Sequence, residues 1–192
     1  MSLTRKRIAI FASGSGTNAE EILAYFNRHS TIQVVLLLSN NPSAFALARA
    51  DKYNVPTKVF TKAQFKDSIV VLTWLQEKEV SHIVLAGFMW LVPSYLTQHY
   101  PDKIINIHPA LLPKFGGKGM YGMRVHEAVK SEGENETGIT IHLVNEKYDE
   151  GRILFQASCE VLEADSPRQI ADKVHALEYA HYAKVIERWI ND

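Results

Sequence analysis

Residues 8–26 have the sequence IAIFASGSGTNAEEILAYF, and this stretch decides the fold. Its first four residues, Ile8–Phe11, are continuously apolar, which predicts a buried strand. A turn rich in glycine and serine follows, and Ala19–Phe26 then has the apolar spacing of an amphipathic helix. A strand, a glycine-rich turn and a helix in direct succession are typical of the first unit of a parallel α/β sheet.

The same alternation continues on the C-terminal side of this unit. Short apolar runs predict strands, and longer runs with helical periodicity predict helices between them. The strands are expected at Val34–Leu38, Thr57–Phe60, Ile83–Ala86 and Ile104–Ile107, and the helices at Phe45–Tyr53 and Phe65–Glu79. Continuously apolar strands are typical of a parallel sheet that is covered on both faces, so we expect a doubly wound α/β fold.

The second half of the chain departs from strict alternation. Pro109–Gly122 is rich in proline and glycine and predicts a loop, and Val125–Ser131 predicts a short helix. Two strands are then expected at Thr137–Val144 and Ile153–Val161, and their closeness in sequence favours an antiparallel pair. We expect one domain over residues 1–192, with a mononucleotide-binding half (1–100) and a half carrying the reaction centre (101–192).

The last helix has a well-defined start in the sequence. Ser166, Pro167 and Gln169 form the pattern of a capping box with proline at the first helical position. Helical spacing then places one set of residues on a shared face: Ile170, Val174, Leu177, His181 and Val185.

The composition limits the classes of partner. Lys+Arg and Asp+Glu both number 21, so chain-wide attraction to nucleic acid or to an anionic membrane is not expected. The apolar runs are too short to span a bilayer. The single cysteine, Cys159, excludes an intrachain disulfide and fits a reducing cytoplasm, the location we expect. The scattered histidines show no metal-ligand spacing, so no metal is expected. We therefore expect small-molecule substrates, with a monomer and a homodimer both open.

The turn from Gly14 to Asn18, with Ser15, Gly16 and Thr17 between them, predicts an anion site. Glycines allow close approach of the backbone, and amides at a helix start attract negative charge. The pattern also fits a dinucleotide fingerprint, but Ser39-Asn40 stands where an acidic residue for a ribose hydroxyl is expected. The Walker pattern is absent. We therefore favour a monophosphate site, with a tight turn that binds nothing as the alternative.

Asn106 and His108 are the first two candidates for a reaction centre. They lie two residues apart at the end of a predicted buried strand, so their side chains point to the same side. An amide donor beside an imidazole suits stabilisation of a developing oxyanion. The alternative is a hydrogen-bonded structural histidine.

Asp149 lies in a turn between the last two predicted strands. Ordinary turn chemistry explains an aspartate here, and sequence separation does not show a contact with His108. If the two side chains pair, the carboxylate is expected to raise the histidine pKa.

Asn106-Ile107-His108-Pro109-Ala110-Leu111-Leu112-Pro113 resembles the hallmark of the folate-dependent formyltransferases. Leu85-Ala86-Gly87-Phe88-Met89 is similar to their folate-side strand and loop, and Tyr148-Asp149-Glu150-Gly151 is similar to the stretch with their aspartate. The turn at residues 13–18 resembles the phosphate loop of the branch that formylates 5-phosphoribosylglycinamide. The resemblance runs from about residue 7 to residue 189.

The resemblance implies an enzyme of purine biosynthesis with a specific reaction. The amine of 5-phosphoribosylglycinamide is expected to attack the formyl carbon of 10-formyltetrahydrofolate, the formyl donor and co-substrate. Asn106 and protonated His108 would stabilise the oxyanion, and Asp149 would hold His108 and assist proton transfer to the folate nitrogen. Binding roles are implied for further residues: the phosphate at Gly14, Ser15, Gly16, Thr17 and Asn18, the ribose at Glu178, and the folate at Lys62, Met89, Trp90, Leu91, Val92, Val144 and Tyr148.

The chain departs from the family pattern at a few positions. Trp90 stands where relatives commonly carry arginine, and Lys62 aligns with a family arginine near the folate glutamate tail. His175 replaces a frequent glutamine. The glycine-rich loop Lys114–Arg124 is longer than in many relatives, and we expect a mobile flap over the substrate. His126 and His142 match recurring family histidines, for which packing or support of other side chains is expected.

Three alternatives to this enzyme can be weighed against the sequence. A formyltetrahydrofolate hydrolase shares the central motif, although an early first strand argues against its extra N-terminal domain. The tRNA-formylating branch carries a further C-terminal domain, which is not expected after residue 192. A nucleotide-binding module without catalysis would bind ligand and turn nothing over.

Overall fold

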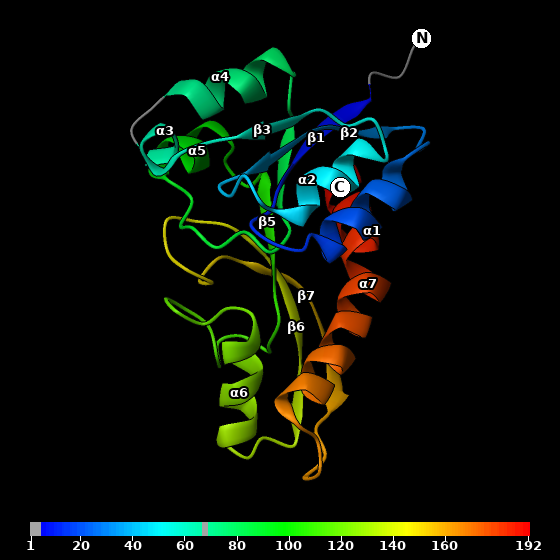
Figure 1. The fold of residues 1–192 in the computed structure, drawn as a ribbon, viewed down its shortest axis with the longest axis vertical. Helices are drawn as coiled ribbons and strands as arrows, with labels where there is room; N and C mark the ends of the chain where they lie inside the picture. The colour runs from blue at the N-terminus through cyan, green and yellow to red at the C-terminus, as the bar shows by residue number, and fades with distance from the viewer. Residues whose placement is uncertain (1–4, 67–68) are drawn as a thin grey trace.

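The computed structural model describes residues 5–66 and 69–192, which form a seven-stranded sheet with helices around it (Figure 1). The strands are β1 (Lys6–Phe11), β2 (Ile32–Ser39), β3 (Thr57–Val59), β4 (His82–Leu85), β5 (Ile104–His108), β6 (Glu136–Leu143) and β7 (Ile153–Glu160). The helices are α1 (Thr17–Phe26), α2 (Phe45–Asp51), α3 (Lys62–Lys66), α4 (Ile69–Glu77), α5 (Ser94–His99), α6 (Met123–Ser131) and α7 (Pro167–Asn191).

The first five strands form a parallel sheet with a core on each face. The strand order is β3-β2-β1-β4-β5-β6-β7, and β1 to β5 pair in parallel. On β1, Ile8 and Ile10 pack in the core under α1, α2 and α7, while Ala9 and Phe11 pack on the face of α3, α4 and α5. This alternation follows from the two-residue period of a strand, and it confirms the predicted doubly wound fold.

The connections around β1 determine where a ligand can bind. The chain runs from β1 outward to β2 and β3, and then returns to the other side of β1 to form β4. Between two strands whose connections leave in opposite directions, the loops separate and leave a crevice at the carboxyl ends. The carboxyl ends of β1 and β4 therefore mark the expected position of a site.

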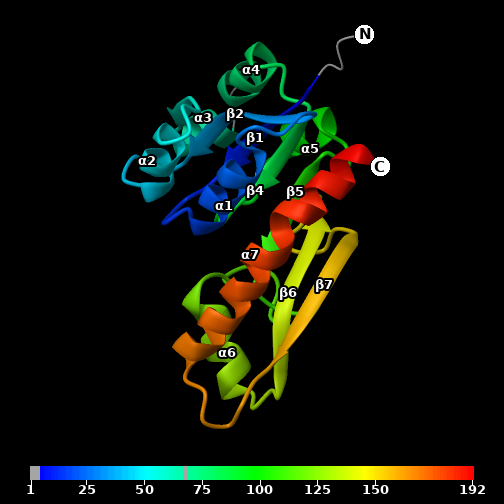
Figure 2. The same ribbon diagram turned by 90° about the vertical axis from the view of Figure 1, so that its right-hand side faces the viewer.

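The second half of the sheet is antiparallel, as predicted. β6 runs against β5, with Asn106 opposite His142 and His108 opposite Thr140, and β7 runs against β6. Figure 2 shows these two long strands side by side, with α7 lying along them. Antiparallel pairing brings the middle of β6 beside the carboxyl end of β5, so β6 adds side chains at the end of a parallel strand.

The start of α7 is confirmed in detail, and its buried face is broader than predicted. Ser166 accepts a hydrogen bond from the Gln169 amide at 3.3 Å, and the Gln169 side chain accepts one from the Ser166 amide at 2.9 Å. Leu177 is only half-buried, whereas Glu178 and Tyr182 are buried. The reason is that α7 packs against α1 as well as the sheet, which covers positions beside the apolar stripe.

The structure differs from the sequence predictions at two helical regions. The predicted helix Phe65–Glu79 corresponds to α3 and α4, and its residues 67–68 lie outside the described residues. The helix α5 was not predicted from the sequence, because its six residues are too few to show helical periodicity.

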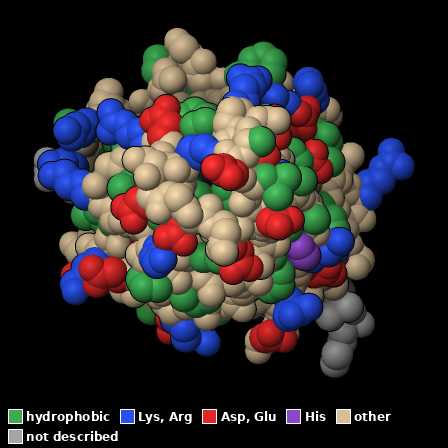
Figure 3. Space-filling view, turned by 90° about the horizontal axis from the view of Figure 1, so that it is seen from below, with side chains coloured by type: hydrophobic (Ala, Val, Ile, Leu, Met, Phe, Trp, Pro, Cys, Tyr) green, Lys and Arg blue, Asp and Glu red, His purple; other side chains and the backbone are tan. Residues whose placement is uncertain are grey.

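The surface carries charges of both signs. Figure 3 shows Lys and Arg side chains interspersed with Asp and Glu on the face seen from below. Among residues 5–66 and 69–192, none of the helices combines the length and apolarity that a membrane crossing needs.

Candidate active site

A cavity of about 620 Å³ lies at the carboxyl ends of β1, β4 and β5. Its walls come from the turn after β1, the segment after β4, the end of β5, the loop before α6, the turn between β6 and β7, and α7. Of the residues predicted for the site, those that line it are Gly14, Ser15, Gly16, Thr17, Asn18, Met89, Trp90, Leu91, Val92, Asn106, His108, Val144, Tyr148, Asp149 and Glu178. Lys62 is exposed on α3 and is not among the lining residues.

Gly16 makes the turn after β1 possible. It has a φ of 71° and directly precedes α1, so its backbone is in the left-handed region that glycine adopts without strain. A Cβ at this position would lie 2.5 Å from the Ala46 Cβ and 2.6 Å from the Ala46 Cα. The glycine therefore serves the close packing of α1 on α2, and the start of α1 also points backbone amides into the cavity wall.

Asn18 and Glu178 meet on the cavity wall, although 160 residues separate them. The Asn18 Nδ2 donates to Glu178 Oε2 at 2.8 Å. Burial raises the pKa of Glu178, while the hydrogen bond from Asn18 opposes this rise. The Asn18 Oδ1 is buried without a hydrogen-bond partner among the described residues, so this end of the cavity wall contains an unsatisfied acceptor.

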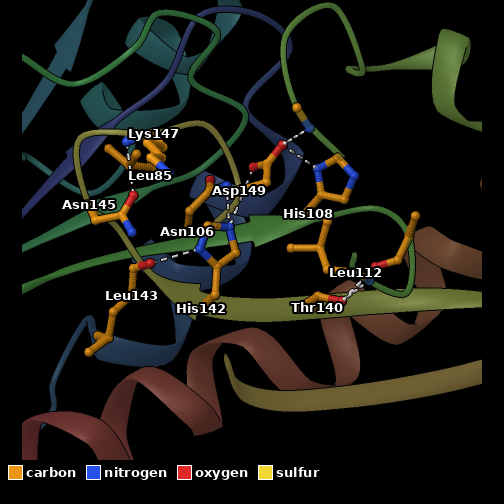
Figure 4. A network of polar contacts seen from close by, with 12 residues as sticks. Leu85, Asn106, His108, Leu112, Thr140, His142, Leu143, Asn145, Lys147 and Asp149 are labelled. Carbon is orange, nitrogen blue, oxygen red and sulfur yellow. Dashed lines mark hydrogen bonds and ion pairs between the residues drawn. The ribbon is translucent and has the colours of Figure 1, made fainter. Parts of the chain in front are cut away.

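The predicted reaction centre is assembled around Asp149. Figure 4 shows Asn106, His108, His142 and Asp149 gathered at one point of the cavity wall. The Nδ1 of His108 lies 3.6 Å from Asp149 Oδ2, and the Nε2 of His142 lies 3.5 Å from Asp149 Oδ1. The Asn106 Nδ2 lies 3.2 Å from the same His142 nitrogen. The structure therefore joins the turn residue Asp149 to the two residues of β5.

The loop before α6 determines which nitrogen of His108 faces the carboxylate. The Nε2 of His108 donates to the Phe115 carbonyl oxygen at 2.7 Å, since a carbonyl can only accept. The neutral ring thus carries its proton on Nε2 and presents the Nδ1 lone pair to Asp149. A second proton on this ring would lie between the two side chains.

Opposing effects set the pKa of His108, and their net result is a lower value. Burial lowers it below the ordinary value, while Asp149 and the hydrogen bond to Phe115 raise it and His142 lowers it further. Asp149 thus acts in the predicted direction, but the net shift is downward because the side chain of His108 is 4% exposed and the charged ring loses its hydration.

Asp149 is held as a carboxylate in a conformation that few residues adopt. Its φ is 55°, and its Oδ2 accepts a hydrogen bond from the Gly117 amide at 2.9 Å. Burial favours a higher pKa, but the contacts with His142, His108 and Gly117 together lower it. The negative charge is therefore stabilised by groups on three different segments of the chain.

The segment from Lys114 to Arg124, whose last two residues begin α6, is connected to both His108 and Asp149. Its Phe115 carbonyl accepts from His108 and its Gly117 amide donates to Asp149, and residues 117–124 line the cavity. Its position over the cavity fits the predicted flap, whose movement stays a prediction.

Two lining histidines were given no direct role by sequence reasoning. His126 is 2% exposed and its pKa is lowered to about 4, because of burial and then because of His175 and His108. Its Nδ1 has no hydrogen-bond partner in the part of the chain that the structure describes. His142 lies between Asn106 and Asp149. The strand period could have placed His142 beside Asn106, but only with the β5–β6 register known.

The opposite wall, formed by residues 88–92 with Val144 and Tyr148, is largely apolar. Trp90 packs at ring-centroid distances of 6.0 Å from Phe60 and 5.8 Å from Phe65, so it belongs to an aromatic cluster. The amide of Met89 donates to Ser13 Oγ at 3.1 Å, which connects this wall to the glycine-rich turn. Within residues 5–66 and 69–192, no three His, Cys, Asp or Glu side chains are grouped in a way that could hold a metal ion.

Comparison with known proteins identifies the family of this chain. The family model described as formyl transferase matches residues 6–186. This chain belongs to the formyl transferase family. The matched residues include both the Gly14–Asn18 turn and the group around Asp149.

Individual members of the formyl transferase family agree over nearly the whole chain. The chain is 40% identical over 188 residues to "phosphoribosylglycinamide formyltransferase, chloroplastic" of Arabidopsis thaliana, covering 95% of this chain but 64% of that protein. It is 36% identical over 190 residues to the phosphoribosylglycinamide formyltransferase of Bacillus subtilis, covering 95% of this chain and 94% of that protein. The chain therefore spans less than two thirds of the plant relative and most of the bacterial one.

Solved structures of the family share the fold. The crystal structure of phosphoribosylglycinamide formyltransferase from Bacillus halodurans superposes with a TM-score of 0.86 at 34% identity. The superposition covers 95% of this chain and 94% of the Bacillus halodurans chain. The mixed sheet with its antiparallel strands β6 and β7 is thus the arrangement of the family.

Proposed function

We propose that this chain transfers the formyl group of 10-formyltetrahydrofolate to the amine of 5-phosphoribosylglycinamide, a step of purine biosynthesis. The products are N-formyl-phosphoribosylglycinamide and tetrahydrofolate. One observation carries the proposal: a single cavity contains both the Gly14–Asn18 turn and the group Asn106, His108 and Asp149. The names of the similar proteins support the same acceptor substrate.

The glycine-rich end suits the phosphate and the ribose. The backbone amides at the start of α1 favour an anion, since the first turn of a helix leaves its N–H groups unpaired. Glu178, which Asn18 orients through a hydrogen bond to Oε2, then offers an acceptor for a hydroxyl group beside the phosphate. The binding roles of these residues are predictions, and measurements of ligand binding test them.

The apolar wall suits the formyl donor. A folate has an aromatic pterin ring, and apolar side chains with a few polar groups are what such a ring requires. Val92 is buried and Met89 and Leu91 are exposed beside the cavity, so this wall has apolar surface that a ligand would cover. A volume of about 620 Å³ lies within the range typical of small-molecule sites.

The group around Asp149 suits the chemical step. When the substrate amine attacks the formyl carbon, negative charge develops on the formyl oxygen. Asn106 Nδ2 can donate a hydrogen bond to this oxygen, and His108 can stabilise it by its positive charge when Nδ1, which faces Asp149, takes up a proton. Breaking the bond from the formyl carbon to the folate nitrogen requires that the amine lose a proton and that the folate nitrogen gain one. Nδ1 of His108 and Oδ2 of Asp149, 3.6 Å apart, are placed to carry this proton.

The test is a coupled measurement of both products. The purified protein, incubated with 10-formyltetrahydrofolate and 5-phosphoribosylglycinamide, should form tetrahydrofolate and the formylated amine in equal amounts. Omission of the amine should abolish tetrahydrofolate formation. Release of free formate at an unchanged rate without the amine would instead identify a hydrolase, and binding of both ligands without turnover would identify a binding module.

A further inference from the structure

His142 is a buried side chain in contact with both Asn106 and Asp149 that has no assigned part in the proposed chemistry. It lies opposite Asn106 in the β5–β6 ladder and is 2% exposed. Opposite residues of antiparallel strands hold their Cβ atoms about 4.5–5.5 Å apart, so the backbone register alone brings the imidazole to the amide.

The proton on His142 can be located from its neighbours. Its Nδ1 lies 2.8 Å from the Leu143 carbonyl oxygen, which can only accept, so Nδ1 carries the proton. In the neutral ring Nε2 is then an acceptor, whereas a proton taken up on this nitrogen would face Asp149 Oδ1, 3.5 Å away. The Asn106 Nδ2 lies 3.2 Å from this Nε2 and donates to it.

This contact determines how the Asn106 amide is oriented. An asparagine side chain can present either its oxygen or its nitrogen in a given direction, and an imidazole acceptor at 3.2 Å selects the nitrogen. The nitrogen carries two N–H groups, of which one is directed to His142. The other remains available to an oxygen in the cavity that Asn106 lines.

The carbonyl that holds His142 is itself closely packed. A Cβ on Gly151 would overlap the Leu143 carbonyl oxygen, so glycine is required for the turn to pass at this distance. The Leu143 amide donates to the Arg152 carbonyl at 2.9 Å. The backbone of β6 therefore fixes the orientation of the His142 ring through the Leu143 carbonyl group.

We propose that His142 is a positioning residue for formyl transfer, whose Nε2 accepts a hydrogen bond from Asn106 and keeps the second N–H of that amide directed at the reacting oxygen. The same nitrogen lies 3.5 Å from Asp149 Oδ1, so the ring also separates the amide from the carboxylate. The inference rests on the proposed function, because the oxygen that Asn106 is held for belongs to the formyl group.

Two variants separate this role from simple packing. In His142→Gln, the side-chain oxygen can reach the place of Nε2 and accept from Asn106. In His142→Asn, the shorter amide can reach the place of Nδ1 and donate to Leu143, but it offers no acceptor to Asn106. The variants thus divide the two hydrogen bonds of the ring between them.

We expect the two variants to differ in turnover and not in substrate affinity. His142→Gln should keep kcat within about threefold of the unmodified protein, while His142→Asn should lower it by about tenfold or more with both KM values nearly unchanged. In addition, His142→Asn combined with Asn106→Ala should lower kcat no further than Asn106→Ala alone, because both changes remove the same donor. The proposal would be overturned if both variants lost turnover equally, in proportion to the loss of folded protein. Normal turnover in His142→Asn would overturn it as well.

A second readout does not depend on activity. The nitrogen chemical shifts of His142 in the unmodified protein should show Nδ1 protonated and Nε2 unprotonated, and the Asn106 side-chain amide signals should shift in His142→Asn more than in His142→Gln. A protonated Nε2 would overturn the proposal even if both variants failed to fold. If the protein showed no formyl transfer while these signals agreed, the proposed function would fail and the contact between His142 and Asn106 would stand.

Discussion

The two ends of the cavity are made from different parts of the polypeptide. At the glycine-rich end, the lining residues belong mostly to one local turn, Gly14–Asn18, for which we propose that backbone amides bind the ligand. At the other end they are side chains from β5, β6 and the turn after β6, brought together by strand register. The first end therefore depends on the shape of the chain, and the second on the identity of its side chains.

The largest effect is expected from a side chain at the second end. His108→Ala should lower kcat/KM by about 10²–10³, equivalent to about 3–4 kcal/mol of transition-state stabilisation, because an oxyanion donor is lost. Steady-state kinetics of formyl transfer give this number. His99→Ala, which changes an exposed histidine on α5, is the matched control and should be unaffected. Near-normal turnover in His108→Ala would remove this histidine from the chemistry.

A change of shape at the first end should act on stability. Gly16→Ala should lower the free energy of unfolding by about 2–4 kcal/mol. The new Cβ would clash with Ala46 of α2, and alanine would be strained in the left-handed backbone conformation of this position. Denaturant unfolding measures the change. Gly14→Ala is the control, since nothing lies within 4 Å of its added Cβ, and it should shift the free energy by less than about 0.5 kcal/mol. Equal destabilisation by both variants would contradict the packing argument.

The second end should also respond to pH, because it contains buried titratable groups. The pKa of His126 is lowered to about 4 from the ordinary 6.5, so the unfolded chain binds the proton first as pH falls. The stability contributed by the neutral ring is complete above about pH 6.5 and is lost as pH falls toward about 4. His126→Phe should reduce this loss. Unfolding curves of both proteins across the window give the difference, and a difference that does not change with pH would refute the assignment.

The smallest effect is expected outside both ends. Lys62 is exposed on α3 and does not line the cavity, so its charge acts through water. Lys62→Ala should change the KM for the formyl donor by less than about twofold. A larger change that disappears at high salt would support the expectation, implied by the family resemblance, that this lysine binds the folate tail.

The sequence was most informative where function follows from neighbouring residues. The β1 strand, its glycine-rich turn and the paired direction of Asn106 and His108 all depend on separations of a few residues, which the periods of strands and helices determine. Asn18 and Glu178 are 160 residues apart, and their contact exists because α7 packs on α1. Likewise, the place of His142 beside Asn106 depends on an antiparallel register that no local pattern specifies.

The Ser13 hydroxyl has a consequence for how the two ends act together. It accepts the amide of Met89, so the turn at the first end and the apolar wall share one hydrogen bond. If an anion displaced the turn on binding, this hydrogen bond would carry the displacement to the first residue of the segment 89–92. In terms of thermodynamic linkage, any resulting coupling free energy between the two subsites would be the same in both directions.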